Sequence, residues 1–100
     1  MIRSLQNPKL KYAKKIRTSS RLRRQDGTFI VEGEREIRLA LASGHSLKQG
    51  FFVEELISTE SQTLLSSNLW EEVSKECFAA ITLRDSTEGL CGIFESRTQT

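Results

Sequence analysis

The 100-residue chain is long enough for one domain and too short for two of ordinary size. Its hydrophobic fraction of 37% and charged fraction of 28% are typical of a globular protein, and no apolar run is long enough to cross a membrane. The N-terminus lacks the apolar stretch of a secretory signal, so we expect a cytoplasmic protein. Two cysteines, Cys77 and Cys91, are too few for a disulfide framework and lack zinc-site spacing, so both are expected to be buried and reduced.

The net charge of +2 hides a strong polarisation along the chain. Residues 1–24 contain nine Lys or Arg and no acid, a charge of +9, so the remaining residues must carry −7 to give the net value. A basic segment of this kind indicates a polyanionic partner on one face of the molecule.

A first helix is predicted to begin at Asn7-Pro8, because Asn caps free amides and Pro suits the first helical position. The helix is amphipathic, with one face for the core and one cationic face. The apolar side consists of Leu10, Tyr12, Ala13 and Ile16, and the opposite side of Lys11, Lys14 and Lys15. We expect the helix to end near residues 18–20, and residues 21–24 to form an arm or a frayed last turn.

Residues 28–31 follow a turn at Asp26-Gly27 and are apolar on both faces, which predicts a central buried strand. Glu32-Gly33 ends this strand, and residues 34–43 predict a helix that stops at Gly44. The expected core stripe of this helix is Ile37, Ala40 and Leu41.

The second half of the chain continues the alternation of strands and helices. Residues 51–53 predict a strand, and a capping box of Thr59 with Gln62 predicts a short helix over residues 60–67. Residues 70–83 form either a strand followed by a helix after Ser74, which we favour, or one helix. A loop over residues 85–89 then leads to a last strand at residues 90–94, in which Gly92 allows close packing.

This order predicts an α/β domain, a three-layer α/β/α sandwich with helices on both faces of a mostly parallel sheet. Phosphate-binding loops, dinucleotide fingerprints and nucleophile elbows are missing from the sequence. His45 is the only histidine and is expected to be a loop residue. One histidine and two cysteines without partners do not indicate nucleophilic catalysis, so we expect this segment of the protein to be non-catalytic.

Two places favour binding. The basic residues of the first 24 positions can neutralise phosphates, and arginine can also stack on exposed bases. Residues 32–35, where a strand enters a helix through Gly33, leave backbone amides open to an anion. Here Glu32 is predicted either to hold a neighbouring loop or to accept a hydrogen bond from a base or ribose.

Three motifs carry a resemblance to a known family. Ser4, Asn7, Pro8 and Lys11 match an S-x-x-N-P-x-x-K start. Arg21 and Arg24 followed by Phe29-Ile30-Val31-Glu32-Gly33-x-Arg35 match its R…G-x-F-hydrophobic-V-E-G-x-R block, and Thr87-Glu88-Gly89-Leu90 stands where Thr-Pro-x-Gly-Ile is usual. With these motifs the chain resembles the N-terminal substrate-binding domain of SpoU-type RNA 2′-O-ribose methyltransferases.

The resemblance implies a domain similar to ribosomal proteins that bind kinked RNA, which docks structured rRNA or tRNA. It also implies that residues 1–95 form this domain and that residues 96–100 begin a linker to a knotted catalytic domain outside the chain. That further domain would bind S-adenosylmethionine, form a homodimer and methylate a ribose, so no cofactor or metal is expected in this segment. The predicted RNA-binding residues are Lys9, Lys11, Lys14, Lys15, Arg17, Arg21, Arg23, Arg24, Glu32, Gly33 and Arg35.

Two alternatives remain open from the sequence. The chain could be a stand-alone RNA-binding protein of the kinked-RNA type. It could also be a protein-interaction domain whose basic arm contacts an acidic partner.

Overall fold

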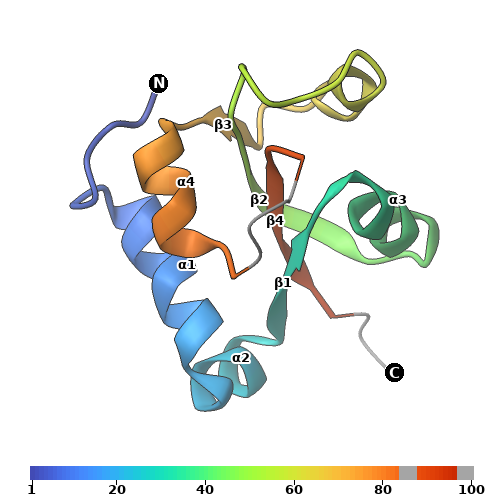
Figure 1. Cartoon of the computed structure of the whole chain (residues 1–100). Helices are drawn as coiled ribbons and strands as arrows, with labels where there is room; N and C mark the ends of the chain where they lie inside the picture. The colour runs from blue at the N-terminus through green and yellow to red at the C-terminus, as the bar shows by residue number, and fades with distance from the viewer. Residues whose placement is uncertain (84–87, 97–100) are drawn as a thin grey trace.

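The computed structural model describes residues 1–83 and 88–96 and shows a four-stranded sheet with helices on both faces (Figure 1). α1 and α4 cover one face and α3 covers the other, which confirms the predicted three-layer sandwich. The helices are α1 (Pro8–Thr18), α2 (Ser20–Asp26), α3 (Glu34–Ala42), the 3-10 helix η1 (Ser61–Leu64) and α4 (Lys75–Ile81). The strands are β1 (Thr28–Glu32), β2 (Ser46–Phe52), β3 (Trp70–Glu72) and β4 (Leu90–Glu95).

The strand order is β1-β4-β2-β3, and β4 runs antiparallel to both of its neighbours, while β2 and β3 are parallel. The prediction of a mostly parallel sheet is therefore wrong. An alternation of strands and helices sets how the layers stack, but it does not set where the last strand enters the sheet or in which direction. β4 enters between β1 and β2, which are the first two strands in the sequence.

The place of the buried central strand also differs from the prediction. β1 lies at an edge of the sheet, and β4 is the strand whose first five residues are buried. Because side chains alternate across a strand, Cys91 and Ile93 pack under α1 and α4, whereas Leu90 and Phe94 pack under α3. β1 is also apolar on both faces, because helices cover both faces of the sheet even at this edge.

Close packing in the sheet depends on two glycines. A Cβ at Gly92 would lie 2.9 Å from Cε1 of Phe94, which confirms the close approach predicted for this position. At Gly50 a Cβ would lie 2.4 Å from Cε3 of Trp70, so this part of β2 must lack a side chain to accommodate the indole ring.

The junction between α1 and α2 differs from the prediction. The first helix does end near residue 18, and it begins as expected, with the Asn7 side chain accepting a 2.9 Å bond from the Lys9 amide. Residues 20–26, however, form a helix of their own and not an arm or frayed turn. Ser19 ends α1 and caps α2 by accepting a 3.1 Å bond from the Leu22 amide, and Gly27, at φ 67°, ends α2.

Five further local predictions can be compared with the structure. The strand followed by a helix over residues 70–83 is confirmed, with Ser74 capping α4. β2 is longer than the predicted 51–53, and η1 replaces the longer helix expected over 60–67. The capping box is wrong, because the Ser58 hydroxyl, not Thr59, accepts the Ser61 amide at 3.0 Å. Leu41 is 41% exposed and does not belong to the core stripe of α3.

The predicted loop at residues 85–89 is described from Glu88 on, where Glu88 and Gly89 form a turn, and residues 84–87 lie outside the described part. Of the polar tail predicted at 96–100, the structure describes Ser96, whose amide donates a 2.7 Å bond to the Gly27 carbonyl. The last described residue therefore lies beside the end of α2.

Candidate functional site

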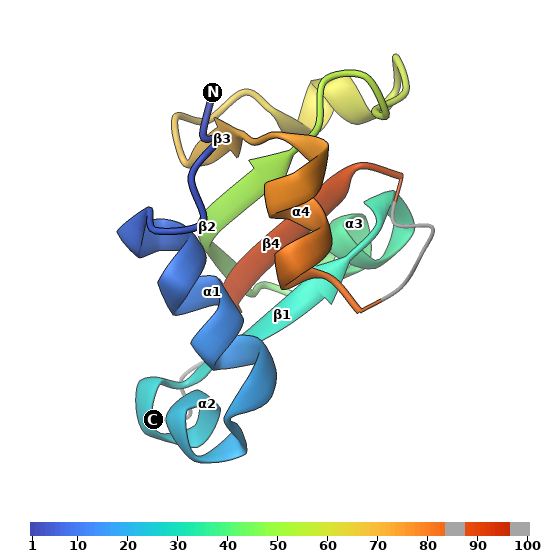
Figure 2. The same ribbon diagram turned by 60° about the vertical axis from the view of Figure 1, so that its left-hand side comes forward.

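α1 lies on the outside of the molecule (Figure 2), and its outer side presents the cationic face that the sequence predicts. Leu10, Ala13 and Ile16 are buried beneath the helix. Lys11, Lys14 and Lys15 are all exposed on its other side. Because this spacing places the three ammonium groups one helical turn apart or less, they form one continuous basic strip.

α2 extends this strip with two exposed arginines, Arg21 and Arg24. We call the exposed side chains of Lys11, Lys14, Lys15, Arg21 and Arg24 the α1–α2 surface. These five cations make no side-chain hydrogen bond or ion pair within residues 1–83 and 88–96, so their charged groups face solvent.

Two other arginines of the basic segment bond to the protein's own backbone. Nη1 of Arg23 donates to the carbonyls of Ile16 at 2.6 Å and Arg17 at 2.9 Å, both in the last turn of α1. Those carbonyls have no partner within the helix, so Arg23 caps α1 and fixes the angle at which α2 leaves it. Arg17 donates a 3.3 Å bond from Nη1 to the Thr82 carbonyl and thereby connects α1 to the end of α4.

Two lysines near the start of α1 are also engaged. Lys9 forms a 2.5 Å ion pair with Glu71 of β3. Lys48 of β2 lies 5.0 Å from the centre of the Tyr12 ring and donates to its hydroxyl, which in turn donates to Asp26. Lys48 is a cation beside α1 that sequence reasoning misses, because it lies outside the basic segment and β2 is expected to begin only at residue 51.

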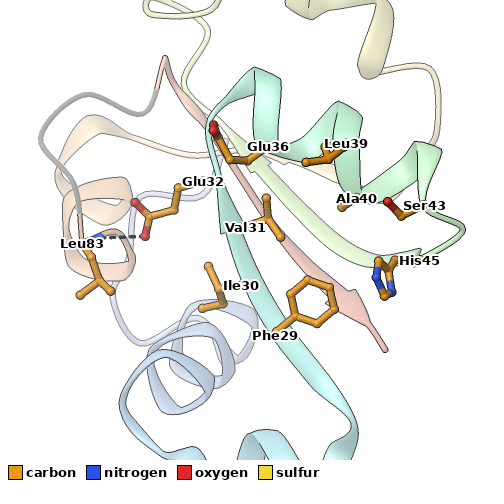
Figure 3. Close-up of a pocket in the computed structure, with 10 residues that line it drawn as sticks. All are labelled: Phe29, Ile30, Val31, Glu32, Glu36, Leu39, Ala40, Ser43, His45 and Leu83. Atoms are coloured by element: carbon orange, nitrogen blue, oxygen red, sulfur yellow. Dashed lines mark hydrogen bonds between the residues drawn. The ribbon is translucent and has the colours of Figure 1, made fainter. Parts of the chain in front are cut away.

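The 32–35 turn is held by bonds within the protein. Glu32 is buried, and its Oε2 accepts a 2.8 Å bond from the Leu83 amide, which confirms the predicted loop-holding role (Figure 3). The Gly33 amide donates to the Leu90 carbonyl at 3.0 Å, and φ of 96° at Gly33 explains the need for glycine. The Glu34 amide already donates a hydrogen bond to an anionic group of the protein, Oε1 of Glu88, at 3.2 Å. Arg35 is exposed.

The Glu34 carboxylate clamps a neighbouring segment onto α3. Its Oε1 accepts hydrogen bonds from the hydroxyls of Ser61 at 2.6 Å and Ser58 at 3.3 Å, and its Oε2 pairs with Arg38 at 3.0 Å. The hydrogen bond from Ser61 and then that from Arg38 lower the pKa of Glu34 below its usual value. Arg38 completes the clamp by donating to the Glu60 carbonyl at 2.8 Å.

A groove of about 540 Å³ runs beside the outer edge of β1, between α3 and the residue 83 region (Figure 3). Its lining is mainly apolar, with Phe29, Ile30 and Val31 from the strand and Leu39 and Ala40 from α3. His45, in a loop as predicted, closes one end with its ring 5.1 Å from that of Phe29. A groove of this character does not attract phosphate.

Cys77 and Cys91 are buried and unpaired, as predicted. Burial raises the pKa of the Cys91 thiol well above its usual range, since a thiolate in the core would lose its hydration. Within residues 1–83 and 88–96, no three His, Cys, Asp or Glu side chains gather as a metal site requires. No helix among these residues is long and apolar enough to span a membrane.

Comparisons with known proteins place this geometry in context. The family model described as the MRM3-like substrate binding domain matches residues 7–92. Curated protein sequences give no match. Among solved structures, an RNA 2′-O ribose methyltransferase is similar over 99% of this chain, with a TM-score of 0.84 and 28% identity.

Two other structures contain the methyl donor AdoMet. The rRNA methyltransferase of Sinorhizobium meliloti with bound AdoMet aligns with 98% of this chain at a TM-score of 0.73 and 29% identity. The SpoU methyltransferase AviRb of Streptomyces viridochromogenes, 17% identical, shares the fold over 93% of the chain at a TM-score of 0.75. The chain spans 37–38% of the length of these three structures. The resemblance to SpoU-type RNA 2′-O-ribose methyltransferases is confirmed.

Proposed function

The chain belongs to the family of MRM3-like substrate-binding domains, and from this premise we propose that it docks structured RNA for an RNA 2′-O-ribose methyltransferase of which it is one part. The similar structures that are named as RNA or rRNA methyltransferases support this proposal, since each aligns with nearly the whole of this chain.

The observation that carries the proposal is the α1–α2 surface. Five cations project from two consecutive helices, and the first 24 residues contain no acid to neutralise them. RNA binding gains most of its affinity from the release of counterions when lysine and arginine replace them on phosphates. Cations that are free of internal partners can do this at no cost to the fold.

We do not assign the other predicted RNA-binding residues to direct contact through the α1–α2 surface. Lys9, Arg17, Arg23, Glu32 and Gly33 already bond within the protein, so we assign them to the support of the docking surface. Arg35 stays a predicted RNA contact, but it lies apart from the α1–α2 surface, because its exposed side chain is on α3.

For the parent protein we propose the division that the family implies. Residues 1–95 form the RNA-docking domain and residues 96–100 begin a linker to a catalytic domain, which binds S-adenosylmethionine, dimerises and methylates a ribose of rRNA or tRNA in the cytoplasm. No residue of this chain is assigned to that cofactor. Sequencing the gene beyond the codon for Thr100 tests this part, because an immediate stop codon would favour a stand-alone RNA-binding protein.

Titration of an RNA hairpin that contains an internal loop tests RNA docking. We expect an association constant whose logarithm falls linearly with the logarithm of salt concentration. Reversing the charge of Lys11, Lys14 and Lys15 to Glu should flatten this slope by roughly 0.7 to 0.9 for each phosphate that is no longer neutralised. Lys75→Glu is the control, since Lys75 is an exposed lysine on α4 outside the α1–α2 surface, and its ion pair with Glu55 is exposed and therefore weak.

The outcomes separate the hypotheses. An unchanged slope in the triple variant would remove α1 from the docking surface. If the wild-type chain binds the hairpin with no salt dependence, or not at all, RNA docking itself fails and a protein-interaction domain becomes the better account.

A further inference from the structure

A hollow lies where α1 meets α2, within the α1–α2 surface. Its volume is about 330 Å³, and its lining consists of Lys15, Thr18, Ser19, Arg21, Leu22 and Gln25. Five of these six side chains carry hydrogen-bond donors, and none is acidic. The strip of cations is therefore concave at this point, with a cation from each helix.

The walls of the hollow are fixed by bonds that do not use its two cations. The Arg23 guanidinium joins α2 to the last carbonyls of α1, and the Thr18 hydroxyl donates to the Lys14 carbonyl at 2.9 Å. The Ser19 hydroxyl accepts the Leu22 amide at 3.1 Å, which leaves its own hydrogen available to a ligand. Lys15 and Arg21 are exposed, and their charged groups make no bond in the described part of the chain.

We propose that this hollow binds one backbone phosphate of the docked RNA, held between the Lys15 ammonium and the Arg21 guanidinium. Its volume corresponds to on the order of ten water molecules, enough for a phosphate together with part of its ribose. Two cations and a hydroxyl donor suit the non-bridging oxygens of a phosphodiester. Leu22 gives the hollow an apolar surface, which suits the carbon face of a sugar and not a free inorganic anion.

This inference rests on the proposed function and adds to it. A flat basic strip lets the RNA backbone slide, whereas a shaped phosphate site fixes its register on the domain. The junction between α1 and α2 would then be the point at which the RNA strand is positioned.

A double-mutant cycle on the 100-residue chain tests the site with the same RNA hairpin. The variants are Lys15→Gln, Arg21→Gln and the two together, and each exposed substitution is checked for an unchanged circular dichroism spectrum. We expect each single variant to weaken binding about tenfold, as for removal of a hydrogen bond to a charged group. Because both side chains hold the same phosphate, the double variant should weaken binding by much less than the product of the two single effects.

The control cycle uses Lys11→Gln and Lys14→Gln, which are neighbours on α1 and lie outside the hollow. Their effects on affinity should multiply, as expected for separate contacts. If the Lys15 and Arg21 effects also multiply while the wild-type chain binds RNA with the expected salt slope, the phosphate site is refuted and RNA docking stands. A wild-type chain that does not bind the hairpin would refute both.

Discussion

The α1–α2 surface and the 32–35 turn are both predicted from the sequence to contact RNA, and the structure shows how different they are. The cations of the α1–α2 surface are exposed and lack internal partners in the described part of the chain. In the turn, the Glu32 carboxylate accepts a hydrogen bond from the Leu83 amide. The Glu88 carboxylate accepts one from the Glu34 amide, which an anionic ligand would otherwise use. Charge in a sequence thus identifies polar groups, but only their partners show whether those groups are free to bind a ligand.

The same contrast appears between two adjacent residues of α2. Arg23 bonds to two carbonyls of α1, whereas Arg24 is exposed. The sequence offers no local signal that separates them, since both belong to the same basic run. Their roles depend on the angle between α1 and α2, which is a property of the folded chain.

The largest effect on stability is expected from Glu32→Ala. The substitution removes a part-buried hydrogen bond between the Glu32 carboxylate and the Leu83 amide, and the loss of a hydrogen bond to a charged group should lower the free energy of unfolding by about 2 kcal/mol. Urea denaturation measures this change. Glu55→Ala is the control, because Glu55 is highly exposed and its ion pair with Lys75 is worth little. Equal stabilities of the two variants would contradict a structural role for Glu32.

A smaller effect should separate Arg23→Ala from Arg24→Ala. Removal of the cap on α1 should lower the free energy of unfolding by about 1 kcal/mol in the Arg23 variant, with little change in the Arg24 variant. RNA binding should weaken in the Arg24 variant with no loss of stability, because Arg24 belongs to the α1–α2 surface, whereas weaker binding in the Arg23 variant should come only together with the loss of the cap that positions α2. Equal behaviour in both measurements would remove the distinction between supporting and binding arginines.

The smallest effect concerns the Glu34 clamp and pH. Because the pKa of Glu34 is lowered in the folded chain, its carboxylate stabilises the fold above the pKa of the unfolded chain. This contribution disappears as the pH falls through the lowered value in the folded state. The wild type should therefore lose its advantage over Glu34→Gln in acid, as measured by unfolding at a series of pH values. Parallel stability curves for the two proteins would contradict the clamp.

Much of the fold is predictable from local signals. Asn7-Pro8 and Ser74 mark helix starts because capping is local, and the Glu34–Arg38 pair follows from helical spacing. The entry of β4 between β1 and β2 is not predictable in the same way, since strand order depends on contacts between residues far apart in sequence. The position of Lys48 beside Tyr12 also depends on tertiary packing, since the two residues are 36 positions apart.

For the candidate site, the sequence correctly indicates that the lysines of α1 are exposed, because amphipathic periodicity assigns each residue to a face. It cannot show that Lys9 pairs with Glu71 or that Glu88 reaches the Glu34 amide, since these partners are separated by 62 and 54 positions. The hollow between α1 and α2 exists because Ser19 ends one helix and begins the next. The sequence predicts the helix end near this residue, but it does not predict the second helix.

The most direct test of the central claim is an NMR titration of the isotopically labelled chain with the RNA hairpin. If the α1–α2 surface docks RNA and the 32–35 turn supports the fold, the largest changes in amide shift should fall within residues 11–25, with little change at residues 32–38 and 58–63. Changes concentrated at Gly33, Glu34 and Arg35, with α1 and α2 unaffected, would contradict this account and make the strand-to-helix turn the RNA site.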